Sequence, residues 1–212
     1  MQLLILKHLM AQGGKWMIIW INGAFGAGKT TCAFELHRRL PNSFVYDPEN
    51  FGYFLNTNVP KTIRESDFQN FPQWRLFNYE ILKLLSQKYH GTIIVPMTIT
   101  NKQYYDEVIG RLTKEGIHIK HFIIYAQKET LVKRLNKRLE FGESWGKQRI
   151  GMCINAFNQD ICEQKIHTDD MSVDSVVSTI ADLANIVLPA DNRSALKKWF
   201  DRILTVLRHV RK

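Results

Sequence analysis

One eight-residue segment constrains the fold of this chain more than any other feature of its sequence. Gly23-Ala-Phe-Gly-Ala-Gly-Lys29-Thr30 matches the pattern G-x-x-x-x-G-K-[ST] at every fixed position. The segment follows the apolar run 17–21, which predicts a buried strand, and it opens a helical pattern over residues 30–40. A strand, a glycine-rich turn and a helix in this order are the context in which the pattern forms a phosphate-binding P-loop.

The residue types in this loop suit the binding of a triphosphate. Its glycines allow positive φ angles, which turn backbone N–H groups inward around phosphates. The start of the following helix adds unpaired N–H groups and a positive dipole end. Lys29 would place a positive charge on the reacting phosphates, and the hydroxyl of Thr30 would bind Mg²⁺. The sequence therefore predicts ATP and Mg²⁺, bound by Gly23, Ala24, Phe25, Gly26, Ala27, Gly28, Lys29, Thr30 and Thr31.

Short apolar runs alternate with helical patterns beyond the loop. The runs predict strands over 43–46, 92–95, 119–125 and 165–168, and the patterns between them predict helices over 73–89, 104–114, 128–139 and 172–184. This alternation predicts an α/β domain with a parallel sheet. The three cysteines form no CxxC pair and show no zinc-site spacing, which favours a reducing, cytoplasmic compartment.

Several segments depart from this regular pattern. Residues 1–16 are interpreted as an N-terminal extension before a domain over 17–190, because they are too short and too soon charged for a signal peptide. Residues 48–72 are rich in Asn, Pro and aromatic side chains and are expected to form an irregular insert on the substrate side. The polar, glycine-containing residues 140–160 are expected to form a mobile lid. Residues 191–212 predict a basic amphipathic helix, and no stretch is apolar enough to span a membrane.

The basic tail has more than one interpretation. From residue 194 to 212, six Lys and Arg residues accompany a single Asp, in a chain of formal net charge +9. Apolar residues recur three or four positions apart, at Leu196, Trp199, Phe200, Ile203, Leu207 and Val210. The helix either packs on the domain with its charges in water, or lies on an anionic membrane surface. Nucleic-acid binding is not expected, since no motif for it accompanies the charge.

Several motifs resemble known families. The compact loop, a short second strand that ends in an acidic residue and an Arg-rich helix before a lid are similar to the nucleoside monophosphate and small-molecule kinases. Within that group the chain resembles the bacterial tunicamycin resistance proteins, on IIWINGAFGAGKT (18–30), YDPENFG (46–52), DFQNFPQWRLFNYE (67–80) and IIVPMTI (93–99). The resemblance covers about residue 17 to the C-terminus. It implies a three-layer P-loop NTPase fold with five parallel strands in the order 2-3-1-4-5, and an ATP-binding protein associated with resistance to a lipophilic nucleoside antibiotic.

One feature departs from many P-loop enzymes. No Asp ends the third strand, where Pro96, Met97 and Thr98 stand instead. The carboxylate that usually supports Mg²⁺ from this position is therefore missing, which argues against a motor-type ATPase.

Asp47 is the candidate catalytic base. It ends the second strand, and ligands of open α/β sheets bind at the carboxyl ends of strands. The resemblance to small-molecule kinases implies that a carboxylate here accepts the proton of the acceptor hydroxyl or helps to bind Mg²⁺, together with Thr30. An ordinary turn Asp before Pro48 explains the residue equally simply. Glu49 is the neighbouring alternative and a candidate substrate contact.

The remaining site candidates are aromatic and basic. Trp74 and Arg75 could contact the acceptor, with the guanidinium as a clamp on phosphate or sugar. Arg134 and Arg138 lie four residues apart on one helix face and could stabilise charge on the γ-phosphate as catalytic residues, along with Lys29. Each of these arginines could also belong to a solvated helix face. Two weaker candidates, Lys147 and Arg149, lie within the lid.

These features predict a kinase-like protein that transfers the γ-phosphoryl group of ATP to a hydroxyl of a nucleoside-like, lipophilic small molecule. One alternative is ATP-dependent sequestration of the antibiotic without chemistry. Another is a nucleoside monophosphate kinase of ordinary metabolism. The expected location is the cytoplasm; under the membrane interpretation of the tail, residues 194–212 would contact the inner face of the membrane. The sequence leaves the oligomeric state open.

Overall fold

The computed structural model describes residues 16–137 and 144–209. Its centre is a sheet of five parallel strands in the order β2-β3-β1-β4-β5, which confirms the order that the family resemblance implied. The strands are β1 (Ile18–Asn22), β2 (Ser43–Val45), β3 (Thr92–Pro96), β4 (Ile119–Tyr125) and β5 (Gln164–His167). The inner strand β1 is buried along its whole length, whereas the edge strand β2 is partly exposed. Continuous apolar runs are typical of parallel strands that helices cover on both faces.

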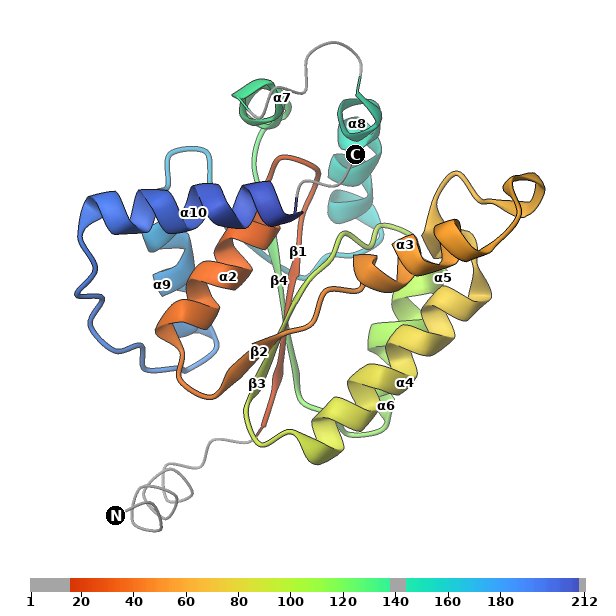
Figure 1. The fold of residues 1–212 in the computed structure, drawn as a ribbon, viewed down its shortest axis with the longest axis horizontal. Coiled ribbons are helices and arrows are strands. Elements are labelled where there is room, and N and C mark those ends of the chain that lie inside the picture. The colour runs from red at the N-terminus through yellow and green to blue at the C-terminus, as the bar shows by residue number, and fades with distance from the viewer. Residues whose placement is uncertain (1–15, 138–143, 210–212) are drawn as a thin grey trace.

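Helices cover both faces of the sheet (Figure 1). One face carries α2 (Lys29–Arg39) and α9 (Val173–Leu183), and α10 (Ala195–His209) packs on α2. The opposite face carries α4 (Pro72–Lys88) and a helix that continues from α5 (Lys102–Tyr105) through the π-helical turn η3 (Asp106–Gly110) into α6 (Arg111–Lys114). At the carboxyl ends of the strands lie α3 (Glu49–Asn58), α7 (Lys128–Lys137) and α8 (Trp145–Gln159).

Apolar side chains from both helical layers meet the sheet. Leu36 of α2, Leu82 of α4 and Val177 of α9 are fully buried. Burial of each such side chain contributes roughly 1.5–3 kcal/mol. This packing fixes the ends of the central strands, where the site is built.

The insert is more regular than expected. Residues 48–72 contain α3 and two 3₁₀ turns, η1 (Lys61–Ile63) and η2 (Phe68–Asn70), so the prediction of an irregular segment is wrong. Aromatic packing explains the order. The ring of Phe51 stacks on Phe77 of α4 with centroids 3.8 Å apart, and Phe68 lies directly over Gly52.

The lid is also more ordered than expected. From Trp145 to Gln159 the chain forms α8, which buries Ile150, Cys153 and Phe157. These residues have helical spacing, but Gly146 and Gly151 interrupt the pattern and hid it from sequence analysis. One face of the segment is therefore apolar and packed, and its role as a mobile lid stays a prediction.

Parts of four predictions lie outside the described residues. They are the N-terminal extension up to residue 15, the end of the helix predicted over 128–139 with Arg138, residues 140–143 of the lid, and the last three residues of the tail. Within the described ranges, no helix is both long enough and apolar enough to cross a membrane.

Candidate nucleotide and acceptor site

The P-loop between β1 and α2 has the backbone geometry of a phosphate cradle. Gly23, Gly26 and Gly28 have φ angles of 151°, 82° and 97°, which favour glycine. A Cβ on Gly23 would lie 2.6 Å from the carbonyl oxygen of Ile124, so this residue fits tightly against β4. A Cβ on Gly28 would have nothing within 4 Å. The loop is therefore packed at its start and open at its end, where a polyphosphate would enter.

The first turn of α2 supplies the charge that this opening requires. Gly28 is the N-cap, and the first turn contains no acidic residue that would compete for an anion. The ammonium group of Lys29 donates to the carbonyl oxygen of Ala24 at 3.2 Å and lies 5.4 Å from the centre of the Phe25 ring. The lysine is thus folded back over the loop, in a position that suits contact with phosphate oxygens.

Two buried polar side chains, which the sequence analysis missed, tie the P-loop to the segment after β3. The Asn22 side chain accepts hydrogen bonds from the N–H groups of Gly23 at 2.8 Å and Ile99 at 3.1 Å. The hydroxyl of Thr98 donates to the carbonyl oxygen of Gly23 at 2.8 Å. Both side chains are almost fully buried. Two features of the sequence could have indicated these residues. Asn22 directly precedes the P-loop motif, and Thr98 lies where the Asp after the third strand is missing.

A cavity of about 290 Å³ opens beside the P-loop, lined by Ala27, Gly28, Thr31, Cys32, Arg134, Lys137, Thr168, Met171, Val173 and Val176. The guanidinium of Arg134 is held there by two hydrogen bonds, to the carbonyl oxygen of Thr168 at 2.5 Å and to its hydroxyl at 3.1 Å. The structure thus brings Arg134 next to the P-loop, on the side of α9. Its predicted contact with the γ-phosphate stays a prediction.

Asp47 lies at the carboxyl end of β2, across β3 from the P-loop. Its Oδ1 accepts a hydrogen bond from the N–H of Glu49 at 3.0 Å, which stabilises the turn before α3. Two strand spacings, about 10 Å, separate β2 from β1. A γ-phosphate and an acceptor hydroxyl can fit in this space. The neighbouring Tyr46 stays protonated, because burial and then the charge of Asp47 raise the pKa of its phenol.

Trp74 and Arg75 are buried and hold the insert together. The Trp74 indole donates to the carbonyl oxygen of Pro48 at 3.0 Å. The Arg75 guanidinium donates to two backbone carbonyls of η2, pairs with Glu107 at 2.5 Å and lies 4.3 Å from the Tyr104 ring centre. The hydrogen bonds from Arg75 are the main cause that lowers the pKa of Glu107. Both residues therefore shape the acceptor side, and a direct contact with the acceptor stays a prediction.

The lid helix α8 reaches across to the insert. Its Arg149 pairs with Asp67 at 2.7 Å, and the guanidinium lies 4.2 Å from the ring centre of Trp145. Trp145 in turn meets Phe25 of the P-loop edge to face, with ring centroids 4.9 Å apart. Arg149 is thus a stronger candidate site residue in the structure than it was in the sequence analysis. Asp67, which caps η2, was not foreseen as a site residue.

Cys153 lies on the buried side of α8, close to the P-loop. Burial raises the pKa of its thiol to about 11, although the positive charges of Lys29 and Arg149 act in the opposite direction. A Cβ on Gly146, in the first turn of α8, would lie 3.2 Å from the Cβ of Phe25, so α8 packs against the P-loop.

No group of three or more His, Cys, Asp or Glu residues in the described ranges could hold a metal ion alone. Mg²⁺ in kinases is bound by few protein ligands and by substrate phosphates. The hydroxyl of Thr30, in the first turn of α2, fits that arrangement.

A family profile described as an AAA domain matches residues 18–147, well over half of the chain. The chain belongs to this AAA-domain family. The match begins with β1 and reaches the first turn of α8, so it includes the P-loop, the insert and Asp47. No curated protein matches the chain.

Several solved structures share the fold of this chain. The chain is similar to the tunicamycin resistance protein of Deinococcus radiodurans, with a TM-score of 0.72 and 29% identity over 83% of this chain and 99% of that one. The APS kinase of Mycobacterium tuberculosis in complex with AMPPNP and APS aligns with a TM-score of 0.55 and 17% identity, over 81% and 98% of the two chains. The shikimate kinase of Bacteroides thetaiotaomicron aligns with a TM-score of 0.55 and 16% identity, over 80% and 99%. The protein is an ATP-binding P-loop protein with a kinase-like fold, similar to a tunicamycin resistance protein.

Proposed function

We propose that this protein transfers the γ-phosphoryl group of ATP to a hydroxyl of a nucleoside-like small molecule, and thereby gives resistance to an antibiotic such as tunicamycin. The observation that carries the proposal is that Asp47 and the P-loop both lie at the carboxyl ends of the strands. The P-loop follows β1, and Asp47 follows β2, two strands away. Similarity to a tunicamycin resistance protein supports the acceptor class. The proposed place of action is the cytoplasm, where ATP is available.

The nucleotide side positions ATP. The amides of the P-loop and the Lys29 ammonium bind the phosphates, and the cavity beside Arg134 receives the base and ribose. When bound by Thr30 and the phosphates, Mg²⁺ would neutralise charge on the transferred group. Most of the rate enhancement then comes from positioning and electrostatics.

The acceptor side carries the proton transfer. The acceptor hydroxyl oxygen forms a new bond to the γ-phosphorus while the bond from that phosphorus to the β,γ-bridging oxygen breaks, and ADP leaves. The hydroxyl proton passes to the carboxylate of Asp47. Arg149, held at the same opening by Asp67, stabilises negative charge on the transferred group.

A second function class is favoured by one observation. Thr98 occupies the place of the missing strand-end carboxylate, and its hydroxyl is bonded to the P-loop backbone. A site with weaker support for Mg²⁺ could bind ATP, close α8 over the antibiotic and retain it without chemistry. This is ATP-dependent sequestration.

The deciding experiment incubates the protein with ATP, Mg²⁺ and tunicamycin and follows the drug by mass spectrometry. We expect a product that carries one additional phosphate. ADP formation without a phosphorylated drug would overturn the kinase proposal, and phosphorylation of a nucleoside monophosphate instead would assign an ordinary metabolic kinase.

Two variants separate transfer from sequestration in cells that express the protein. Lys29→Ala should abolish resistance under both proposals, because each requires ATP. Asp47→Asn should abolish resistance only if proton transfer is required, with a loss in transfer rate of about 10²–10⁴-fold. Resistance that persists in Asp47→Asn while ATP affinity is unchanged would favour sequestration.

A further inference from the structure

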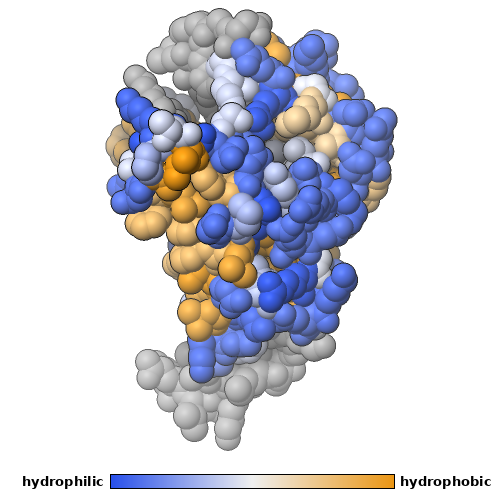
Figure 2. Space-filling view, turned by 90° about the vertical axis from the view of Figure 1, so that its right-hand side faces the viewer, coloured by the Kyte–Doolittle hydropathy of each residue, from blue (hydrophilic) through white to orange (hydrophobic). Residues whose placement is uncertain are grey.

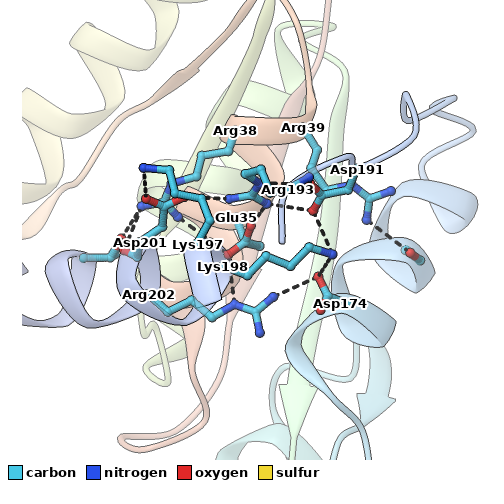
Figure 3. Close-up of polar contacts among 12 residues, drawn as sticks. Glu35, Arg38, Arg39, Asp174, Asp191, Arg193, Lys197, Lys198, Asp201 and Arg202 are labelled. Carbon is cyan, nitrogen blue, oxygen red and sulfur yellow. Dashed lines mark hydrogen bonds and ion pairs between the residues drawn. The ribbon is translucent and has the colours of Figure 1, made fainter. Parts of the chain in front are cut away.

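The C-terminal helix α10 is attached to the domain by its charged face (Figure 3). Glu35 of α2 is completely buried, and its carboxylate accepts hydrogen bonds from Arg193 and, at 3.0 Å, from Arg202. Lys198 of the same helix pairs with Asp191 in the preceding loop at 3.1 Å. These basic side chains are held in ion pairs, whereas the sequence analysis expected the charges of a packed helix to lie in water.

Arg202 joins two helices of the domain through its guanidinium group. Its Nε donates to the Glu35 carboxylate of α2 at 3.0 Å, and its Nη2 donates to the Asp174 carboxylate of α9 at 2.8 Å. The Arg202 side chain is only 24% exposed, so water competes weakly for these bonds. A planar guanidinium also fixes the direction of both bonds at once. Arg202 thus fixes the position of α9 relative to α2.

The same two helices form walls of the cavity beside the P-loop. Thr31 of α2 and Val173 and Val176 of α9 are among its lining residues. Glu35 follows Thr31 by four residues, and Asp174 directly follows Val173. The bridge through Arg202 therefore lies within about one helical turn of the cavity on both helices. A change in the spacing of α2 and α9 would change the width of the cavity.

A second polar contact between α2 and α9 is weaker. Arg39 of α2 donates to the hydroxyl of Ser178 on α9 at 3.4 Å. Both residues lie one turn further from the cavity than Glu35 and Asp174. A bond from a guanidinium to a hydroxyl is also weaker than one to a carboxylate. The Arg202 bridge is therefore the stronger of these two links and the nearer to the cavity.

The insert is held on α4 by apolar contacts instead. Phe51 of α3 stacks on Phe77 of α4, and Phe77 is 39% exposed in an apolar area over these two helices (Figure 2). Apolar side chains can repack with little loss when their neighbours move, whereas a guanidinium between two carboxylates requires one geometry. The ion pairs of α10 are thus suited to setting a precise spacing between α2 and α9.

We propose that Arg202 is a positioning residue for ATP, which holds α9 against α2 so that the cavity between them fits the base and ribose. The C-terminal helix then supports the nucleotide site from outside, since no residue of α10 is among the described residues that line the cavity. This inference rests on one part of the proposed function, that the cavity receives the base and ribose, and does not depend on phosphotransfer. The phosphates bind to the P-loop, so their affinity should not depend on the bridge.

The test measures the affinity of the full-length protein for ATP and for inorganic tripolyphosphate, each with Mg²⁺, by isothermal titration calorimetry. Tripolyphosphate offers the P-loop a chain of three phosphates without the base and ribose. In Arg202→Ala, we expect the Kd for ATP to rise about tenfold and the Kd for tripolyphosphate to change less than about twofold. Arg202→Lys should give a similar selective loss, because an ammonium group keeps a charge beside Glu35 but does not hold both carboxylates in this geometry.

A further variant and a matched control complete the test. Asp174→Asn removes only the α9 half of the bridge and leaves Glu35 paired, so it tests the link even if Arg202→Ala folds poorly. It should also raise the Kd for ATP several-fold and leave that for tripolyphosphate nearly unchanged. Lys197→Ala is the control, because Lys197 pairs with Asp201 of the same helix at 3.0 Å and is 60% exposed. Both affinities should stay as in the unmodified protein.

The possible failures have different results. Unchanged ATP affinity in folded Arg202→Lys and Asp174→Asn would overturn the inference and leave the assignment of the cavity intact. Equal losses for ATP and tripolyphosphate would also overturn it, because the effect would then not be confined to the cavity. If the cavity does not receive the base and ribose, the unmodified protein will bind ATP no more tightly than tripolyphosphate, and the inference falls with that part of the proposed function.

Discussion

The nucleotide side and the acceptor side of this site are built in different ways. Around the P-loop, the chain uses backbone geometry: positive φ angles at three glycines, a helix N-terminus and two buried side chains that bond to the loop. On the acceptor side it uses contacts between side chains of separate segments, such as Arg149 with Asp67 and Phe51 with Phe77. Backbone geometry of this kind suits phosphate binding in P-loops in general, whereas side-chain contacts can be changed to suit one acceptor.

The largest expected effect tests the backbone of the nucleotide side. Gly23→Ala should lower the free energy of unfolding by about 2–4 kcal/mol, because its Cβ would clash with the carbonyl oxygen of Ile124. Gly28→Ala should cost only about 1 kcal/mol in stability, since its Cβ meets open space. It should nevertheless weaken ATP binding strongly, because the methyl group would occupy the phosphate opening.

Urea unfolding and ATP titration of the two variants check this pair of predictions. A Gly28→Ala protein that binds ATP normally would show that the opening is not where phosphates lie. Equal unfolding free energies for the two variants would show that the start of the loop is not tightly packed.

A smaller effect tests the side-chain bridge of the acceptor side. Arg149→Ala and Asp67→Ala should each raise KM for the acceptor several-fold and leave KM for ATP nearly unchanged, because the bridge positions α8 over the insert. Arg149→Ala should also lower kcat, because it removes the positive charge that acts on the transferred group. A double-mutant cycle on the free energy of unfolding should give a coupling energy of about 1 kcal/mol between the two residues. This value is expected because Asp67 is largely buried and Arg149 is partly buried.

The exposed pair Lys102–Asp106 is the control for this cycle, because both of its side chains are about half exposed. Its coupling energy should be about 0.3 kcal/mol, with no effect on either KM. Changes in the KM for ATP as large as those for the acceptor would remove the distinction between the two sides.

The smallest expected effect is a difference in the reaction rates of the cysteine thiols, which reports the mobility of the nucleotide side and the acceptor side. Cys32 on α2 and Cys153 on α8 are both buried, and Cys162 is exposed. The raised pKa of Cys153, about 11, leaves about one thiolate in a thousand near pH 8. We expect Cys162 to react quickly, Cys153 to react slowly as α8 opens, and Cys32 to react slowest. The rate at Cys153 should rise with pH, because the thiolate fraction grows as the pH approaches this pKa.

Peptide mass spectrometry after labelling with a thiol reagent gives these rates separately. Addition of ATP and acceptor should slow Cys153 further by holding α8 in place, and should leave the order of the other two cysteines unchanged. Labelling of Cys32 as fast as that of Cys153 would mean that the P-loop helix opens as readily as the lid helix.

The difference between local backbone geometry and contacts of distant side chains also explains which features could be predicted from the sequence. The P-loop motif and the apolar runs of the strands are local patterns, so the five strands and the nucleotide side followed from them, and the strand order followed from the family resemblance. The order within 48–72 and 145–159 depends on contacts between distant residues, such as Phe68 over Gly52 and Trp145 on Phe25. Asp67 had no local signal, because its partner Arg149 lies 82 positions away. The orientation of α10 was hidden for the same reason, since the buried Glu35 on α2 decides which face turns inward.

Isothermal titration calorimetry of the folded protein with ATP and Mg²⁺ tests the central claim most directly. The claim is that the loop from Gly23 to Thr30 binds a triphosphate through its amides and Lys29. We expect saturable heat of binding in the unmodified protein and in Asp47→Asn, and a loss of affinity of at least about 100-fold in folded Lys29→Ala. Absence of binding heat in the unmodified protein, or unchanged affinity in Lys29→Ala, would contradict the claim.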